Sequence, residues 1–173
     1  RPELTCVCIA PQVTCIPPGA FSDCAKLEYV HLNEGLQVIE KDAFRGCTAL
    51  QSVTTPSTVV KLGNCAFQGC RNLAEVRLNK GLQVIGGLAF KGCTSLRSVT
   101  LSLTVIELGE EAFCRCSNLV GLQLNEGLQV IGGRAFEYCT ALRSVAFPST
   151  VTKLGGRAFF GCSNLVELQL NEG

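Results

Sequence analysis

The chain has 173 residues and a formal net charge of +1, so charge favours neither nucleic acid nor an anionic membrane as its partner. Hydrophobic residues make up 47% of the sequence, but no apolar run approaches the roughly 18 residues of a membrane helix. The chain contains no methionine and begins at Arg1 without a signal peptide, so we expect a segment cut from a longer protein.

An Ala-Phe pair recurs every 23 residues. A cysteine follows each phenylalanine by three residues, and a leucine follows it by six. A fixed period of 20–50 residues is typical of a solenoid, in which short units stack on copies of themselves. We therefore predict an array of seven repeats over residues 20–173, with residues 1–19 forming a partial first repeat or an N-terminal cap. The phenylalanines are Phe21, Phe44, Phe67, Phe90, Phe113, Phe136 and Phe159.

Downstream of the Ala-Phe pair, apolar and polar residues alternate. In one unit Val76 and Leu78 are apolar, whereas Glu75 and Arg77 are polar. This alternation indicates a half-buried strand, and because every strand starts at the same point of its unit, the sheet must be parallel. Only Thr55 places a hydroxyl at an inward position. The phenylalanine and the cysteine three residues later would share one face of a single helical turn, so we expect a short 3₁₀ or helical turn opposite the sheet.

The segment that follows each strand comes in two kinds. One begins Asn33-Glu34-Gly35 and the other Pro56-Ser57-Thr58, and the two kinds alternate along the chain. Asn and Gly tolerate left-handed backbone, while Pro withdraws a donor from the ladder, so both end a strand. The true period is thus 46 residues, and the array is truncated where Asn171-Glu172-Gly173 starts a further copy.

These units resemble the leucine-rich repeats of the BspA-like class, also called the Treponema pallidum type. That class has 23-residue units of the form V-x-x-I-G-x-x-A-F-x-x-C-x-x-L-x-x-V-x-I-P. The departures are mild: Thr55 in a strand, Glu40 where other copies have glycine, and Asn for Pro in alternate units. The residues that match in the last complete unit are Val151, Leu154, Gly155, Ala158, Phe159, Cys162, Leu165 and Leu168.

The resemblance implies a repeat solenoid: a right-handed leucine-rich-repeat array with one parallel β-sheet face and short 3₁₀ or helical turns opposite. It also implies a binding role, since bacterial members look like surface adhesins for host matrix proteins. By resemblance the chain would lie at the cell surface or be secreted.

Twelve cysteines could indicate a disulfide scaffold, but seven of them form one column. Neighbours in such a column are about 4.8 Å apart with parallel Cβ bonds, whereas a disulfide needs Cβ atoms about 3.8 Å apart. We predict buried free thiols, which would suit a reducing intracellular compartment. Among Cys6, Cys8, Cys15 and Cys24 a capping disulfide stays open. A metal site there is disfavoured, because no histidine is expected to lie close and Cys-x-Cys is a weak signal.

No catalytic motif occurs, and the one histidine leaves no material for a histidine-rich site, so we predict neither an enzyme nor a cofactor. The function must then depend on the surface, and the first candidate is the outward face of the sheet. The second is an aromatic patch of Tyr138 and Phe160 on the turn side. The candidate partner-binding residues of the sheet are Tyr29, His31, Glu75, Arg77, Gln123, Glu167 and Gln169.

The sequence therefore predicts a non-catalytic scaffold that binds a protein, of the surface adhesin or receptor type. It predicts no nucleic-acid partner, no membrane insertion and no bound metal. The alternative is a structural or linker subunit of a larger intracellular assembly, which the abundant thiols favour. A sheet face that is merely solvated is the other alternative.

Overall fold

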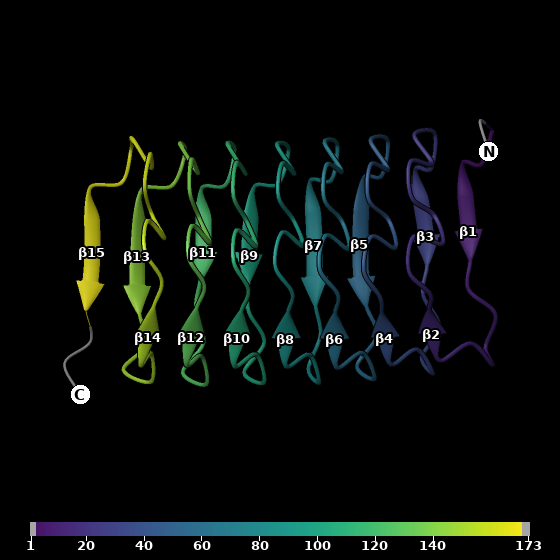
Figure 1. Ribbon diagram of the computed structural model, residues 1–173, viewed down its shortest axis with the longest axis horizontal. Coiled ribbons are helices and arrows are strands. Elements are labelled where there is room, and N and C mark those ends of the chain that lie inside the picture. Colours follow the sequence, from purple (N-terminus) through teal and green to yellow (C-terminus); the bar gives the residue numbers. More distant parts are fainter. Residues whose placement is uncertain (1–2, 171–173) are drawn as a thin grey trace.

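Each 23-residue unit makes one turn of a solenoid in the computed structural model, which describes residues 3–170. The copy that starts at Asn171 lies outside the described residues. Every turn contributes one strand of three or four residues and one strand of two. Figure 1 shows the two kinds running in opposite directions, both across the long axis of the molecule. The longer strands are β1 (Cys6–Cys8), β3 (Tyr29–His31), β5 (Ser52–Thr55), β7 (Glu75–Leu78), β9 (Ser98–Thr100), β11 (Gly121–Gln123), β13 (Ser144–Phe147) and β15 (Glu167–Leu170).

The longer strands lie side by side and parallel, as the alternation predicted, but their hydrogen bonding is interrupted. They pair in twos, β1 with β3, β5 with β7, β9 with β11 and β13 with β15. Breaks in the ladder therefore fall between β3 and β5, between β7 and β9, and between β11 and β13. Each break follows a strand with an Asn-x-Gly return and precedes one with the other kind of return. The 46-residue period of the sequence is thus also the period of the sheet.

The returning segments form a second parallel sheet, which corrects the expectation of a single sheet face. Its register aligns Val38 with Lys61 and Ile39 with Leu62. In these two-residue strands the second residue, Ile39 or Leu62, is buried. Its backbone therefore needs hydrogen-bond partners, and the same segment of the next turn supplies them. The seven strands are β2 (Cys15–Ile16), β4 (Val38–Ile39), β6 (Lys61–Leu62), β8 (Val84–Ile85), β10 (Glu107–Leu108), β12 (Val130–Ile131) and β14 (Lys153–Leu154).

The Ala-Phe segment is not helical, and residues 3–170 contain neither an α- nor a 3₁₀-helix. The residues two before and two after each phenylalanine have left-handed backbone, with φ of 58° at Asp42 and 71° at Gly46 around Phe44. Such residues interrupt a right-handed helix. The N–H of Phe44 instead donates to the Ala66 carbonyl of the next turn at 2.8 Å, and the same bond recurs at each phenylalanine of the column from Phe21 to Phe136. The turns therefore join neighbouring repeats.

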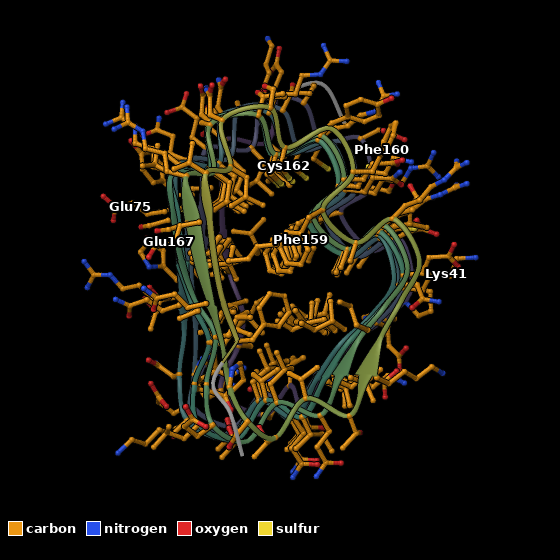
Figure 2. All side chains as sticks on the ribbon, turned by 90° about the vertical axis from the view of Figure 1, so that its left-hand side faces the viewer. Lys41, Glu75, Phe159, Phe160, Cys162 and Glu167 are labelled. Atoms are coloured by element: carbon orange, nitrogen blue, oxygen red, sulfur yellow. The ribbon has the colours of Figure 1, made fainter. Side chains whose placement is uncertain are left out.

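Stacked phenylalanines run through the core. The centroids of Phe44 and Phe67 are 5.2 Å apart with ring planes at 3°, and the five central rings are fully buried. The view along the solenoid in Figure 2 shows side chains filling the space between the two sheets, with Phe159 in the middle. One apolar column per repeat position thus makes a core that runs the length of the array.

The cysteine column is a ladder of buried free thiols, as predicted. The thiol of Cys70 donates to the Phe44 carbonyl at 3.2 Å, and that of Cys93 donates to the Phe67 carbonyl at 3.2 Å. The same bond recurs from Cys47 to Cys162. Burial, with a smaller contribution from Cys24, raises the pKa of the Cys47 thiol to about 12. A thiol that stays protonated is a poor nucleophile, so this column has a structural role.

Thr55, the one hydroxyl among the inward strand residues, is fully buried. Its hydroxyl donates to the Arg77 carbonyl at 3.4 Å and accepts the N–H of Asn79 at 3.1 Å. The buried hydroxyl that departs from the repeat pattern is therefore satisfied by hydrogen bonds to the backbone of β7 and of the residue that follows it.

Candidate functional site

The outward residues of the longer strands form two rows that run along the length of the solenoid. The register pairs Ser52 with Glu75 and Thr54 with Arg77, so equivalent residues of neighbouring units lie next to each other. Glu75 and Glu167 project from this face, away from the core (Figure 2). All seven candidate residues are exposed: Tyr29, His31, Glu75, Arg77, Gln123, Glu167 and Gln169.

Local contacts bring some of these candidates together in pairs. Arg77 and Glu75 form an ion pair at 3.9 Å, and because both side chains are well exposed it stabilises the fold by less than about 1 kcal/mol. At the C-terminal end, the Gln169 amide donates to the Glu167 carboxylate at 2.8 Å. In between, Gln123 accepts the hydroxyl of Thr100 at 3.2 Å. The candidates thus line an extended face, and they do not converge on one point.

The surface of the sheet face forms a hollow at two of the breaks in the hydrogen-bonded ladder. The larger hollow, about 790 Å³, lies between β7 and β9 and is lined by Glu75, Arg77, Arg97, Ser98 and Thr100 among others. Its lining contains two guanidinium groups and one carboxylate. It can therefore hold an acidic or hydrogen-bonding group of a partner.

The smaller hollow, about 290 Å³, lies between β3 and β5. Tyr29, His31, Glu34, Ser52 and Thr54 contribute to its lining. The Tyr29 hydroxyl donates to the Gln51 side chain at 3.5 Å, which reaches across the same break.

The candidates chosen from the sequence leave out Arg97 and Glu34, which also line these hollows. The signal that could have found them is the 46-residue alternation, because each hollow lies at a break with that period. The alternation marks these positions as different from the rest of the sheet, and the opening itself is seen in the hydrogen-bonding pattern of the strands.

The second candidate, Tyr138 with Phe160, brings two aromatic rings together on the turn side. Their rings meet edge to face with centroids 5.7 Å apart. The guanidinium of Arg115 lies over the Tyr138 ring and that of Arg157 over the Phe160 ring, at 5.5 and 5.8 Å from the centroids. Phe160 lies on the opposite side of the solenoid from Glu75 (Figure 2). These four residues, the aromatic patch, form a second exposed surface.

Two cysteines and the histidine meet at the N-terminal end of the sheet face. The sulfur atoms of Cys6 and Cys8 and a ring nitrogen of His31 all lie within 4.8 Å of one another. The expectation that no histidine lies near these cysteines is wrong, because the register pairs Cys8 with His31. The two residues are one 23-residue period apart, and that spacing is the signal that could have revealed their contact.

Residues 3–170 include no helix with the length and hydrophobicity that a membrane crossing requires.

Comparisons with known proteins agree with this architecture. The sequence profile of the BspA type leucine-rich repeat region matches residues 3–120 and 84–173, with six copies. A leucine-rich repeat protein of T. pallidum is 32% identical, with a TM-score of 0.79, and the match covers 96% of this chain and 69% of that one. One from Eubacterium ventriosum is 26% identical with a TM-score of 0.84, over 92% of this chain and 43% of that one.

A third structure has the same fold at lower identity. It is a leucine-rich cell surface protein of Faecalibacterium prausnitzii, 24% identical with a TM-score of 0.55, over 99% of this chain and 61% of that protein. The match thus spans 69%, 43% and 61% of the three proteins. Comparison with curated proteins gives no significant match. The repeat columns, the solenoid and the profile match together show that the chain belongs to the BspA-type leucine-rich repeat family.

Proposed function

We propose that this chain is a non-catalytic scaffold that binds a protein partner through the outward face of its longer strands. The observation that carries the proposal is the contrast between two sets of residues. The phenylalanine, cysteine and leucine columns repeat almost unchanged and are buried, or partly buried at Phe21, Phe159 and Leu165 in the end units, so stacking accounts for them. The outward rows vary from unit to unit, are exposed, and border the hollows between β3 and β5 and between β7 and β9.

The chemistry of the larger hollow suggests what it would hold. Arg77 and Arg97 offer guanidinium donors, and Ser98 and Thr100 offer hydroxyls. A partner segment with an acidic side chain would pair with one guanidinium and take further hydrogen bonds from the hydroxyls. We infer a polar protein surface as the partner, and the description of the F. prausnitzii structure as a cell surface protein supports a surface adhesin or receptor-type module.

A charge swap on this face tests the proposal. The double variant Glu75→Arg with Arg77→Glu keeps the net charge and reverses the pair beside the larger hollow. The matched control, Lys61→Glu with Glu107→Lys, makes the same change at exposed positions of the second sheet. Binding to a panel of purified extracellular-matrix proteins would be measured by surface plasmon resonance. We expect the first variant to lose binding and the control to keep it, and equal binding by both would refute this face.

A second candidate is a structural or linker subunit inside a reducing compartment, and the free state of the twelve cysteines favours it. Cys15 is exposed and would be oxidised outside such a compartment. Trapping thiols with an alkylating reagent in intact cells distinguishes the two candidates. A Cys15 that is alkylated only after lysis and reduction supports the surface module, and one that is already free inside the cell supports the linker.

A further inference from the structure

Cys6, Cys8 and His31 form a cluster, here called the thiol–imidazole cluster, on two neighbouring strands. Cys6 and Cys8 are two residues apart in β1, so they point to the same side while Val7 points to the core. The register of β1 and β3 then sets His31 beside Cys8. The three side chains are thus held by a hydrogen-bonded strand pair, which positions ligands better than a loop does.

We propose that the thiol–imidazole cluster is a binding site for Zn²⁺. Two thiolates and one imidazole are ligands that zinc prefers, and three protein ligands leave its fourth position open. In tetrahedral coordination the bond lengths of zinc to sulfur and nitrogen place the ligand atoms roughly 3.5–3.8 Å apart. The ligand atoms of the cluster already lie within 4.8 Å of one another, so small side-chain rotations bring them to that spacing.

The strand geometry disfavours a disulfide between the two cysteines. Two residues along a parallel strand advance about 6.6 Å, and their Cβ bonds point the same way. A disulfide requires Cβ atoms about 3.8 Å apart, so closing it would distort β1 and its pairing with β3. A metal ion spans the wider gap through two longer bonds, and the strand pair stays intact.

The location of the site would let the fourth coordination position of the zinc ion take part in binding a partner. All three ligands are exposed on the sheet face, and His31 also lines the hollow between β3 and β5. A bound ion would therefore carry a water that a carboxylate or imidazole of another protein could replace. This site needs no other part of the proposed function, and the ion would bind whether or not the face has a partner.

Metal titration of the reduced, metal-free chain tests the site. Zn²⁺ would be titrated in competition with a chromophoric chelator, and Co²⁺ would be followed by its thiolate-to-metal charge-transfer absorption. We expect one ion per chain. Because even the loss of a hydrogen bond to a ligand costs about 10–100-fold in metal affinity, Cys6→Ser, Cys8→Ser and His31→Ala should each weaken binding at least about tenfold.

The matched control is Cys15→Ser, which removes another exposed thiol outside the cluster and should bind as tightly as the unchanged chain. Far-UV circular dichroism checks that every variant is folded. Absence of binding would overturn the proposal, and so would several ions per chain or binding that His31→Ala leaves unchanged. Loss of binding in Cys15→Ser would assign the ion to other ligands and overturn it as well.

Discussion

Replacing Phe90 by alanine is the sharpest test of the core. The ring is fully buried and stacks between two others, 5.4 Å from Phe67 and 5.1 Å from Phe113. A phenylalanine buries roughly 150–250 Å², which at about 25 cal/mol per Å² gives an upper limit of about 4–6 kcal/mol. Alanine keeps the Cβ atom, so we expect Phe90→Ala to lower the free energy of unfolding by about 3–5 kcal/mol, the usual range for such a change.

The matched control is Phe160→Ala, which removes the same atoms from a ring that is 52% exposed. It should cost less than about 1 kcal/mol, because about half of the ring faces solvent and the rest contacts the surface residues Tyr138 and Arg157. The chain has no tryptophan, so guanidinium unfolding would be followed by circular dichroism, with a reductant to keep the thiols free. Similar losses in the two variants would refute a phenylalanine column as the core of the array.

Three further changes test other parts of the framework. Cys93→Ser should destabilise by about 1–3 kcal/mol in chemical unfolding, because the shorter serine side chain leaves a buried hydroxyl too far from the Phe67 carbonyl that the thiol contacts. An unchanged midpoint would contradict this. Gly92→Ala should destabilise by about 1–2 kcal/mol in thermal unfolding, since φ is +73° there. The control Gly156→Ala has a φ outside the left-handed region and open space around the new Cβ, so it should cost less than about 0.5 kcal/mol. Equal costs in the two variants would refute the left-handed turn. Glu111→Gln should destabilise by about 0.5–1 kcal/mol at pH 7, because the hydrogen bond from Lys91 lowers the pKa of the Glu111 carboxyl. Because this pKa is lower in the folded than in the unfolded protein, the ionised carboxyl stabilises the fold at pH values above its unfolded-state pKa near 4.3. That stability is lost as the pH falls through the folded-state pKa, so the unfolding curves of Glu111→Gln and the unchanged chain should converge in acid.

The columns could be predicted from the sequence because each residue type in them has one physical reason to recur. Phe44 and Cys47 return at every unit since stacking gives each copy the same buried environment. The strands were equally clear, because alternation over four residues, as at Glu75–Leu78, has only one simple explanation.

The turns could not be predicted because their backbone is set by neighbouring repeats. The left-handed position before each phenylalanine is occupied by residues as different as Asp42, Leu88 and Glu111. No residue preference marks such a column, and hydrogen bonds to the next turn impose its conformation. The two-residue strands, such as Val38–Ile39, are too short to show a period.

The surface contacts required the register of the strands. Cys8 and His31 are distant in the chain, and only the alignment of β1 with β3 places them side by side. The hollow beside Arg97 likewise depends on the broken ladder between β7 and β9, which no single unit reveals. The outward rows were identified correctly as exposed, and their role in binding stays a prediction.

Hydroxyl-radical footprinting with a bound matrix protein tests the central claim most directly, because reactive side chains mark both candidate surfaces. Tyr29 and His31 report on the sheet face, and Tyr138 and Phe160 report on the aromatic patch, all in one experiment. If the varied face of the longer strands is the binding surface, the partner will protect Tyr29 and His31 and leave Tyr138 and Phe160 as reactive as before. Protection of Tyr138 and Phe160 with unchanged oxidation of Tyr29 and His31 would contradict it.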